Sequence, residues 1–294
     1  YNEKMYSHIK KYTPYLFLLG TIVLLGVFFY VPFLYTLKLS FFDFSKNIYE
    51  PIFIGLENYK YLLFDSQFHK VIVNTFVYLL VCVPFLTLFP MFLAILINQK
   101  IMFLQVYKLI IYLPVIISIV VVAIAFKWLY GQNGIINYVL SLVNISPISF
   151  LTDPNVAIYS VCALTIFKGV GYYMMIYLAS LMSVNRELVE ACQVDGANWF
   201  EVHKNVTVPH LMPTIALVST ISSISALKVF VEIYMLTKGG PLNSTKTIVY
   251  YIYERAFENL DMGIASAASF ILLIIVLAFS MINIFVFESK RYKI

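Results

Sequence analysis

The chain has 294 residues, of which 61% are hydrophobic and only 12% are charged. A soluble domain has about 45–50% apolar and about 25% charged residues, so this composition predicts a polytopic membrane protein. The formal net charge of +5 comes from basic residues spread over the loops. Because they form no compact basic patch, we expect lipid headgroups and no nucleic acid as their partners.

Six apolar runs are each long enough to cross a bilayer as a helix, which takes about 20 residues. They lie near residues 14–36, 71–97, 105–130, 156–183, 211–236 and 263–287. The runs lack the strict alternation of a β-barrel strand, so the predicted fold is all-α with six transmembrane helices. The first run is too long for a signal-peptide core and has no small-residue cleavage site before Tyr30 and Tyr35, so we expect it to be a retained span.

The orientation follows from the basic residues of the loops. One side of the membrane would carry ten of them in short segments: Lys4, Lys10, Lys11, Lys100, Lys108, Arg186, Lys204, Lys290, Arg291 and Lys293. The other side would carry seven in longer loops: Lys38, Lys46, Lys60, Lys70, Lys238, Lys246 and Arg255. The positive-inside rule therefore predicts that both termini are cytoplasmic.

Between the spans, the outer segment 37–70 is aromatic-rich and is interrupted by Pro51 and Gly55, so we expect short interfacial helices and turns there. In the outer loop 131–154, the sequence GQNGIINYVL predicts a turn followed by a short helix. In the fifth span, Lys228 and Glu232 are four residues apart, which predicts that they share one helical face.

The stretch 185–213, NRELVEACQVDGANWFEVHKNVTVPHLMP, is a polar island between the fourth and fifth spans, on the predicted cytoplasmic side. Its apolar residues have an amphipathic helical rhythm that is broken at Gly196 and stopped by Pro209. An amphipathic helix lying on the membrane is the simpler alternative. It is disfavoured because Glu187, Glu190 and Asp195 would face anionic headgroups.

No motif for catalysis is visible: the chain lacks HExxH, GxSxG, paired-cysteine metal sites and a GxxxxGK[ST] phosphate loop. We interpret Cys82, Cys162 and Cys192 as packing residues, with no disulfide framework and no metal site. His8, His69, His203 and His210 are scattered. Because this chain has no phosphate loop, any process here that consumes ATP would need another subunit to hydrolyse it.

The residues Glu190-Ala191-Cys192, Asp195-Gly196-Ala197 and Val208-Pro209 have the order and spacing of a known motif. They resemble the EAA loop of binding-protein-dependent ABC importer permeases. Cys192 replaces the third alanine by another small residue. His203 stands where sugar-type permeases usually have phenylalanine.

The resemblance extends over nearly the whole chain, from about Tyr12 to Phe287. It is carried by FIGLENYKYLL, FHKVIVNTFVY, AILINQK, YLPVIISIVVVAIAFKWLY with GIIN, and LTKGGPLNSTKTIVYYIYERAF, in family order. These segments are similar to the sugar branch of the family. More narrowly, they look like the first of two paired permeases for di- and oligosaccharides and glycerol-3-phosphate.

The resemblance implies a type I ABC importer permease fold in a bacterial cell membrane. It also implies a second homologous permease, two ATP-binding subunits that carry ATP and Mg, an extracellular solute-binding protein and a carbohydrate substrate. This chain would bind no cofactor or metal of its own. The expected organisation is an N-terminal part at 1–70, a permease domain at 71–287 with its cytoplasmic coupling loop at 185–213, and a cytoplasmic tail at 288–294.

Two sets of residues are candidates for function. The candidate contacts to the ATPase subunit combine small residues, which permit close approach, with charges that fix orientation: Glu187, Glu190, Ala191, Asp195, Gly196, Ala197, Trp199 and Pro209. The candidate substrate pathway consists of ionisable and aromatic groups within spans, which are expected to face the bundle or a wet cavity: Lys168, Tyr172, Tyr173, Lys228 and Glu232. Tyr177 is a further candidate for contact with a sugar.

Two other classes of protein remain as alternatives. A stand-alone channel or secondary carrier would purify as a homo-oligomer without an ATPase, although no internal repeat supports a carrier. A membrane enzyme of lipid or sugar transfer would need clustered acidic residues or histidines at an interface, and the sequence has no such cluster.

Overall fold

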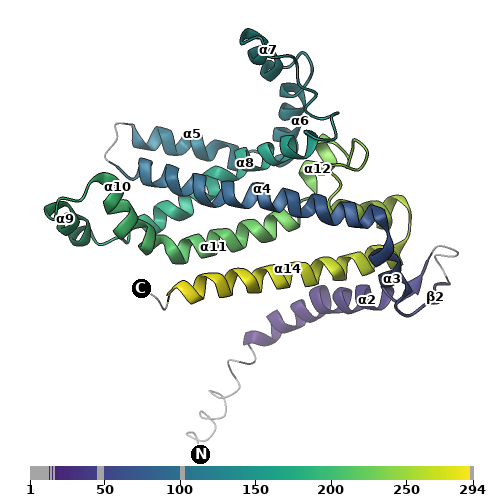
Figure 1. Cartoon of the computed structure of the whole chain (residues 1–294). Helices are drawn as coiled ribbons and strands as arrows, with labels where there is room; N and C mark the ends of the chain where they lie inside the picture. The colour runs from purple at the N-terminus through teal and green to yellow at the C-terminus, as the bar shows by residue number, and fades with distance from the viewer. Residues whose placement is uncertain (1–12, 14, 16, 45–49, 100–102, 292–294) are drawn as a thin grey trace, which may run out of the picture. The chain divides into compact units, whose positions relative to one another are not determined.

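The computed structural model describes residues 13, 15, 17–44, 50–99 and 103–291. Predictions about Lys4, Lys10, Lys11, Lys46, Lys100 and Lys293 lie outside these ranges. The described chain is mostly helical (Figure 1) and divides into two compact units. The first unit spans 1–63 and 252–270, and the second spans 64–251 and 271–294.

The elements follow one another in this order: η1 (Gly26–Tyr30), α2 (Val31–Leu39), β1 (Phe42–Asp43), β2 (Ile52–Phe53), α3 (Glu57–Phe64), α4 (Ser66–Ile97), α5 (Leu104–Ile116), α6 (Ile119–Leu129), α7 (Ile135–Leu142), α8 (Ala157–Leu181), α9 (Arg186–Val194), α10 (Trp199–Val202), η2 (His203–Thr207), α11 (Val208–Leu227), α12 (Val231–Leu236), α13 (Ile248–Tyr253), η3 (Glu254–Glu258) and α14 (Met262–Arg291). The η elements are π-helical turns.

The first unit joins the first span to a small outer structure. The span runs from Phe17 to Leu39, and none of its residues in Gly26–Leu39 is buried in the chain itself. Strands β1 and β2 then pair antiparallel, with Phe42 opposite Phe53. The outer segment thus contains the predicted short helix, α3, and also a strand pair that the sequence did not indicate.

Close packing holds this outer structure to the start of α14. Asn58 is buried, and its Nδ2 donates to the Ser40 and Phe42 carbonyls at 2.9 and 3.0 Å. A Cβ added to Gly263 would lie 2.1 Å from the Phe42 carbonyl oxygen. Glycine at position 263 is therefore required for this approach.

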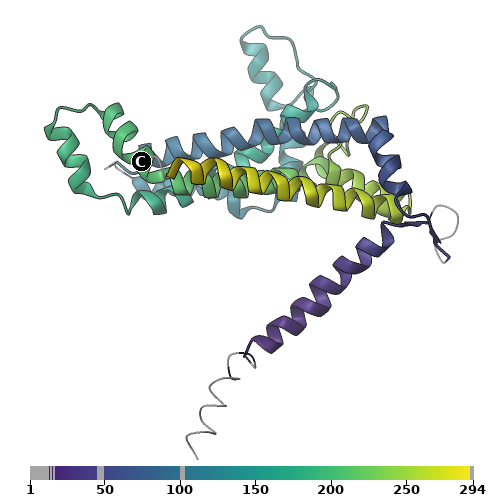
Figure 2. The ribbon, with the colours of Figure 1, turned by 60° about the horizontal axis from the view of Figure 1, so that its bottom comes forward.

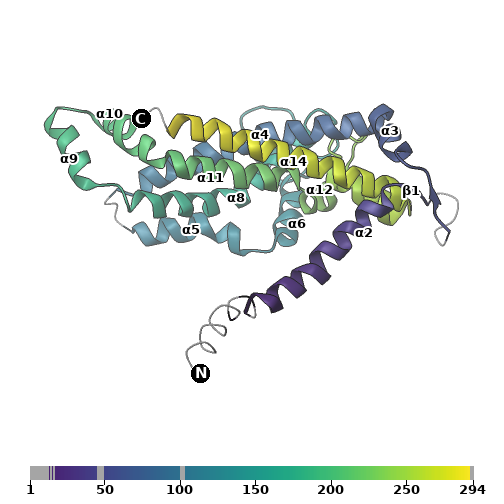
Figure 3. The same ribbon diagram turned by 90° about the horizontal axis from the view of Figure 1, so that it is seen from below.

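The second unit is a helical bundle built around α8, which packs against α4, α5 and α11 (Figures 1 and 3). Its core includes Tyr78 of α4, Met174 and Tyr177 of α8 and Leu211 of α11, all fully buried. The long helix α4 continues through Pro84 and Pro90 without a break. Prolines are tolerated in a span where neighbouring helices satisfy the freed backbone groups.

Five described helices are long and apolar enough to cross a membrane, or six if one bent pair counts as a single span. The bent pair is α5 and α6, which meet at 97°. The third predicted span, at 105–130, is therefore built from two helices. The chain is extended between the two helices, with Ile117 at φ −70° and ψ 140°. Lys168 of α8 donates hydrogen bonds to carbonyls at this break.

The fifth span also ends earlier than predicted. Helix α11 stops at Leu227, and α12 begins at Val231. The Val229 carbonyl between them accepts a hydrogen bond from Thr247 Oγ1 at 3.2 Å. Because the helix is interrupted, the prediction that Lys228 and Glu232 share one helical face was wrong.

Side chains of α4 hold the outer loop that follows α12. Asn74 Nδ2 donates to the carbonyls of Asn243 and Lys246 at 2.8 and 3.0 Å. Lys70 Nζ donates to the Leu242 carbonyl at 2.8 Å, and Thr75 Oγ1 accepts from the Ile248 N–H at 3.1 Å. The loop is thereby fixed to a helix about 170 residues earlier in the chain.

We expect Asn74→Ala to destabilise the second unit, because Asn74 is buried and its loss leaves two carbonyls without these donors. The expected cost is about 1–3 kcal/mol, read as a lower melting temperature of the purified protein. Asn155→Ala is the matched control, since Asn155 is exposed. Equal melting temperatures for the two variants would contradict the anchoring role of Asn74.

Candidate functional site

Helix α9 is defined at both ends by local contacts. At its start, Asn185 Oδ1 accepts the Glu187 N–H at 2.9 Å. At its end, Gly196 takes a left-handed conformation with φ +84°, and the Ala197 N–H reaches back to the Cys192 carbonyl at 3.0 Å. Glycine is favoured at such a helix end because it has no Cβ penalty there.

Helix α10 starts with a reciprocal capping box. The Glu201 N–H donates to Asn198 Oδ1 at 3.0 Å, and the Asn198 N–H donates to Glu201 Oε2 at 2.8 Å. The expectation of two short helices separated at Gly196 is thus met by the geometry.

The helix does not stop at Pro209, so that prediction was wrong. Helical structure continues from Trp199 to Leu227 through the π-helical turn η2. Pro209 lies at the start of α11, where the missing N–H of proline costs least. Before it, the Val208 N–H donates to the His203 carbonyl, five residues back, which makes the turn wider.

The α9–α10 segment lies at one end of the second unit (Figures 1 and 2). It exposes both apolar and acidic side chains. Its apolar members are Leu188, Val194, Trp199 and Phe200, which are 56%, 87%, 49% and 67% exposed. Its acidic members are Glu187, Glu190, Asp195 and Glu201, all exposed. Among the other candidates Ala191 is exposed and Ala197 is half-buried.

We call this set of side chains the loop surface. Its mixture of exposed apolar and acidic groups is typical of a protein–protein contact. Leu188 and Val194 were not among the contact residues predicted from the sequence. The sequence could have indicated them, because each is a large aliphatic residue inside a polar stretch.

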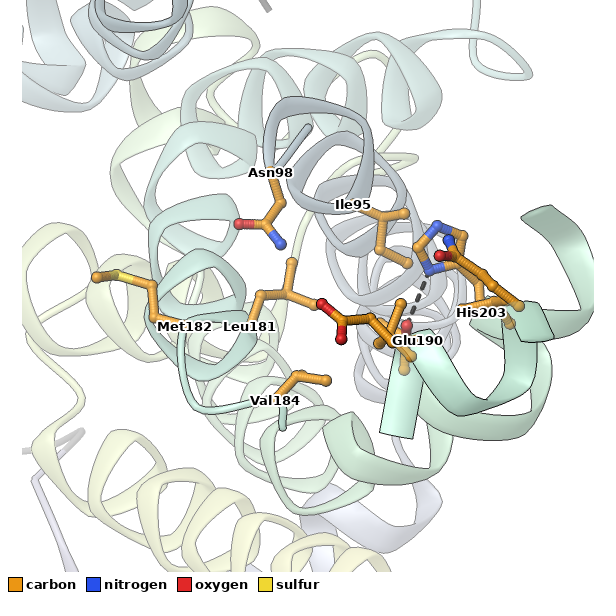
Figure 4. Close-up of a pocket in the computed structure, with 11 residues that line it drawn as sticks. Ile95, Asn98, Leu181, Met182, Val184, Glu190 and His203 are labelled. Carbon is orange, nitrogen blue, oxygen red and sulfur yellow. Dashed lines mark hydrogen bonds between the residues drawn. The ribbon is translucent and has the colours of Figure 1, made fainter. Parts of the chain in front are cut away.

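A cavity of about 470 Å³ lies between the α9–α10 segment and the nearest ends of α4 and α8 (Figure 4). It is lined by Ile95, Asn98, Leu181, Met182, Val184, Val189, Glu190, Gln193, Val202, His203 and Thr207. His203 Nδ1 and Thr207 Oγ1 form a hydrogen bond of 2.8 Å, and the Trp199 ring meets His203 edge-on at 4.3 Å. Glu190 therefore belongs both to the loop surface and to this cavity.

Lys168 lies in the middle of α8 and binds backbone. Its Nζ donates to the carbonyls of Pro114, Val115 and Ile117 at 3.3, 3.2 and 3.0 Å. Close contact between α8 and α5 makes this possible, since a Cβ on Gly171 would lie 2.3 Å from the Ile111 carbonyl oxygen. Lys168 thus occupies the break between α5 and α6.

The other candidates for the substrate pathway are separated by the fold. Glu232 is half-buried on α12, whereas Lys228 is exposed at the end of α11. Within the described ranges, Lys228 and Glu232 form no ion pair. Tyr172 is 43% exposed, and Tyr173 is buried.

Tyr177 is fully buried, and its hydroxyl has no hydrogen-bond partner among the described residues. Cys82 Sγ lies 4.0 Å from the Cys162 carbonyl oxygen, which agrees with a packing role for these two residues. In the part of the chain that the structure describes, no group of three or more His, Cys, Asp or Glu side chains could hold a metal ion.

The family model for the binding-protein-dependent transport system inner membrane component matches residues 63–291. The chain belongs to this family. It is therefore a multi-pass membrane component of a transport system, and the resemblance carried by the loop at 185–213 is confirmed.

The similarity to individual relatives extends over almost the full length of this chain. The chain is 32% identical over 288 residues to the probable ABC transporter permease protein YurN of Bacillus subtilis, covering 96% of this chain and 98% of the relative. It is 30% identical over 294 residues to the lactose transport system permease protein LacF of Rhizobium radiobacter, covering 97% and 98%.

A solved structure supports the fold. A chain of a bacterial alginate ABC transporter, in complex with an alginate pentasaccharide-bound periplasmic protein, superposes with a TM-score of 0.82. It is 29% identical, and the match covers 95% of this chain and 96% of that chain. The predicted fold of an ABC importer permease is thereby confirmed.

Proposed function

We propose that this chain is the permease subunit of an ATP-driven importer and forms half of the translocation pathway for a carbohydrate. The observation that carries the proposal is the exposed α9–α10 segment, with its spacing of Glu190, Gly196 and Pro209, in a member of the permease family. A disaccharide or oligosaccharide is the favoured substrate class. LacF is a lactose permease protein, and the alginate transporter was solved with a pentasaccharide-bound protein.

The partners follow from the same proposal. A second homologous permease would complete the pathway, and an extracellular solute-binding protein would deliver the sugar. Two ATP-binding subunits would bind and hydrolyse ATP with Mg. This chain would be non-catalytic and would transmit their motion through the loop surface. The proposed permease domain is 71–287, preceded by 1–70 and followed by a cytoplasmic tail at 288–294.

The proposed contacts to the ATPase are the eight residues predicted from the loop: Glu187, Glu190, Ala191, Asp195, Gly196, Ala197, Trp199 and Pro209. Exposed acidic groups there favour a partner surface with basic groups, because complementary charges fix orientation. For the substrate pathway, Tyr172 and Glu232 remain proposed contacts to the sugar. Tyr173 and Lys228 are proposed with them, and Lys168 borders the pathway while it binds backbone.

The decisive experiment is co-purification and reconstitution. The permease, expressed with the proposed second permease, ATP-binding subunit and solute-binding protein, should purify as a heteromer. In proteoliposomes the heteromer should hydrolyse ATP faster when sugar-loaded binding protein is added. A homo-oligomer that transports without an ATPase would establish the alternative, a channel or secondary carrier.

Charge reversal in the loop surface tests the coupling role. We expect Glu190→Arg to reduce sugar import at least about 10-fold, which corresponds to about 1.4 kcal/mol, because it would place like charges across the proposed contact. ATPase activity should no longer respond to sugar-loaded binding protein. Glu57→Arg is the control, since Glu57 is also an exposed carboxylate, and it pairs with Lys60 of α3 at 2.7 Å. Unchanged import by the Glu190 variant would refute the coupling assignment.

A further inference from the structure

The break in the third span leaves backbone carbonyls without helical partners. In a continuous α-helix the carbonyl of residue i accepts the N–H of residue i+4. The carbonyls of Pro114, Val115 and Ile117 would then accept from residues 118, 119 and 121. The 97° bend between α5 and α6 removes these bonds. Backbone groups left without partners are costly within a membrane span.

Lys168 replaces the missing donors. An ammonium group has three protons, and all three carbonyls lie within 3.0–3.3 Å of Lys168 Nζ. Its positive charge also suits the C-terminal end of α5, where the helix dipole is negative. The contact at Gly171, one turn further along α8, fixes the distance between the two helices.

The same carbonyls therefore have two mutually exclusive sets of donors. In the bent state the donors come from Lys168, and in a straight state they would come from the chain's own N–H groups.

We infer that Lys168 is a positioning residue that holds the third span in its bent state, and that a continuous helix is the other state of this span. An importer must alternate between inward- and outward-facing states, and a two-state span provides one element of that change. The use of the two states in transport rests on the proposed function. The existence of the bent and straight states does not depend on it.

Spin labels on both sides of the break can distinguish the states. Tyr107 of α5 and Trp128 of α6 are 49% and 80% exposed, so Tyr107→Cys and Trp128→Cys can carry the labels after the three native cysteines are replaced. From the rise of 1.5 Å per residue, the backbone positions are about 20 Å apart at a bend of 97° and about 32 Å apart in a straight helix. Pulsed dipolar spectroscopy on the assembled transporter resolves this difference.

We expect the short distance in the parent protein and the long distance in Lys168→Met. Lys168→Arg should keep the short distance, because a guanidinium also supplies several donors. Lys228→Met is the matched control: Lys228 is exposed at a helix end, and its loss should leave the short distance unchanged. A short distance in Lys168→Met would overturn the inference.

Ser118→Pro provides a second, independent variant. Proline has no N–H to donate to the Pro114 carbonyl, and it requires an extended preceding residue. Proline also fixes its own φ at about −65°. The backbone of the bent state already suits proline at position 118, since Ser118 has φ −55° and Ile117 is extended. Adding Ser118→Pro to Lys168→Met should restore the short distance, and it should also allow recovery of folded protein if Lys168→Met alone is unstable. A distance that stays long would contradict the two-state assignment.

Import measurements then test whether transport uses the straight state. Ser118→Pro alone should reduce sugar import about 10-fold while the ATP-binding subunit still co-purifies, because the span is locked bent. Normal import by this variant would overturn the role of the switch in transport. If instead the parent protein binds no ATPase subunit, the proposed function fails, and the label distances, then measured on this chain alone, still decide whether Lys168 holds the bend.

Discussion

Gly171→Ala is expected to destabilise the helical bundle strongly, because α8 and α5 touch through their backbones at this position. An added Cβ would lie 2.3 Å from the Ile111 carbonyl oxygen and 3.0 Å from Tyr112 Cα. Backbone atoms cannot rotate away, so the helices must separate. Inserting a methyl group into a well-packed core costs about 1–3 kcal/mol, occasionally more, and we expect the upper end of this range. The loss is read as a lower melting temperature of the purified protein.

Gly169→Ala is the matched control, two residues earlier in the same helix. There the added Cβ would meet Leu86 Cδ2 at 2.8 Å, which is the end of a side chain that can change its rotamer. We expect a loss below about 1.5 kcal/mol. If both variants lose the same stability, the close approach of α5 to α8 does not depend on Gly171.

Separation of α5 from α8 should also withdraw Lys168 from the carbonyls of the third span, because Gly171 and Lys168 contact the same segment. The label distance described for the Lys168 variants should therefore lengthen in Gly171→Ala and stay short in Gly169→Ala. This second measurement separates a specific effect at the break from a general loss of stability.

Gly196→Val is expected to abolish most sugar import while the membrane bundle remains folded. Gly196 has φ +84°, and an added Cβ would have open space around it, so only the backbone conformation opposes the change. A β-branched residue in this conformation costs of the order of 1–3 kcal/mol. The chain should relieve the strain by ending α9 differently, which changes the position of α9 relative to α10.

The measurement is sugar uptake by reconstituted transporter, together with stimulation of ATPase activity by sugar-loaded binding protein. We expect both to fall at least about 10-fold, the equivalent of about 1.4 kcal/mol. Gly196→Asn is the control of nearly equal size, because asparagine tolerates the left-handed conformation, and it should retain most of the activity. Wild-type uptake by Gly196→Val would show that the angle between α9 and α10 is unimportant for coupling.

Local sequence signals were sufficient for the α9–α10 segment. Asn185 and Asn198 are good helix-capping residues, Glu201 completes a capping box, and Gly196 is suited to a helix end. Each of these contacts joins residues no more than a few positions apart. The two short helices and their junction could therefore be predicted, and so could the acidic character of the loop surface.

The cavity beside Glu190 could not be predicted, because its walls come from distant parts of the chain. Ile95 and Asn98 belong to the end of α4, Leu181 to the end of α8, and Glu190 to α9. Which side chains meet across such a space depends on the packing of α4 against α8. The continuation of the helix past Pro209 was also missed, because proline is read as a helix stop unless the π-helical turn before it is known.

The sequence by itself determined that this protein crosses the membrane several times, and it determined the order of the spans and the position of the polar loop at 185–213. The physical reason is that the length of the apolar runs and the spacing of Glu190, Gly196 and Pro209 can be seen in the sequence and do not depend on how the helices pack. Only the tertiary structure decided where the third and fifth spans are interrupted. The partners that stabilise those interruptions are Lys168, more than 50 residues from the carbonyls it binds, and Thr247, 18 residues beyond Val229. A backbone break in a membrane needs partners for the groups that it frees, and here these partners are distant in sequence, so they become visible only in the folded chain.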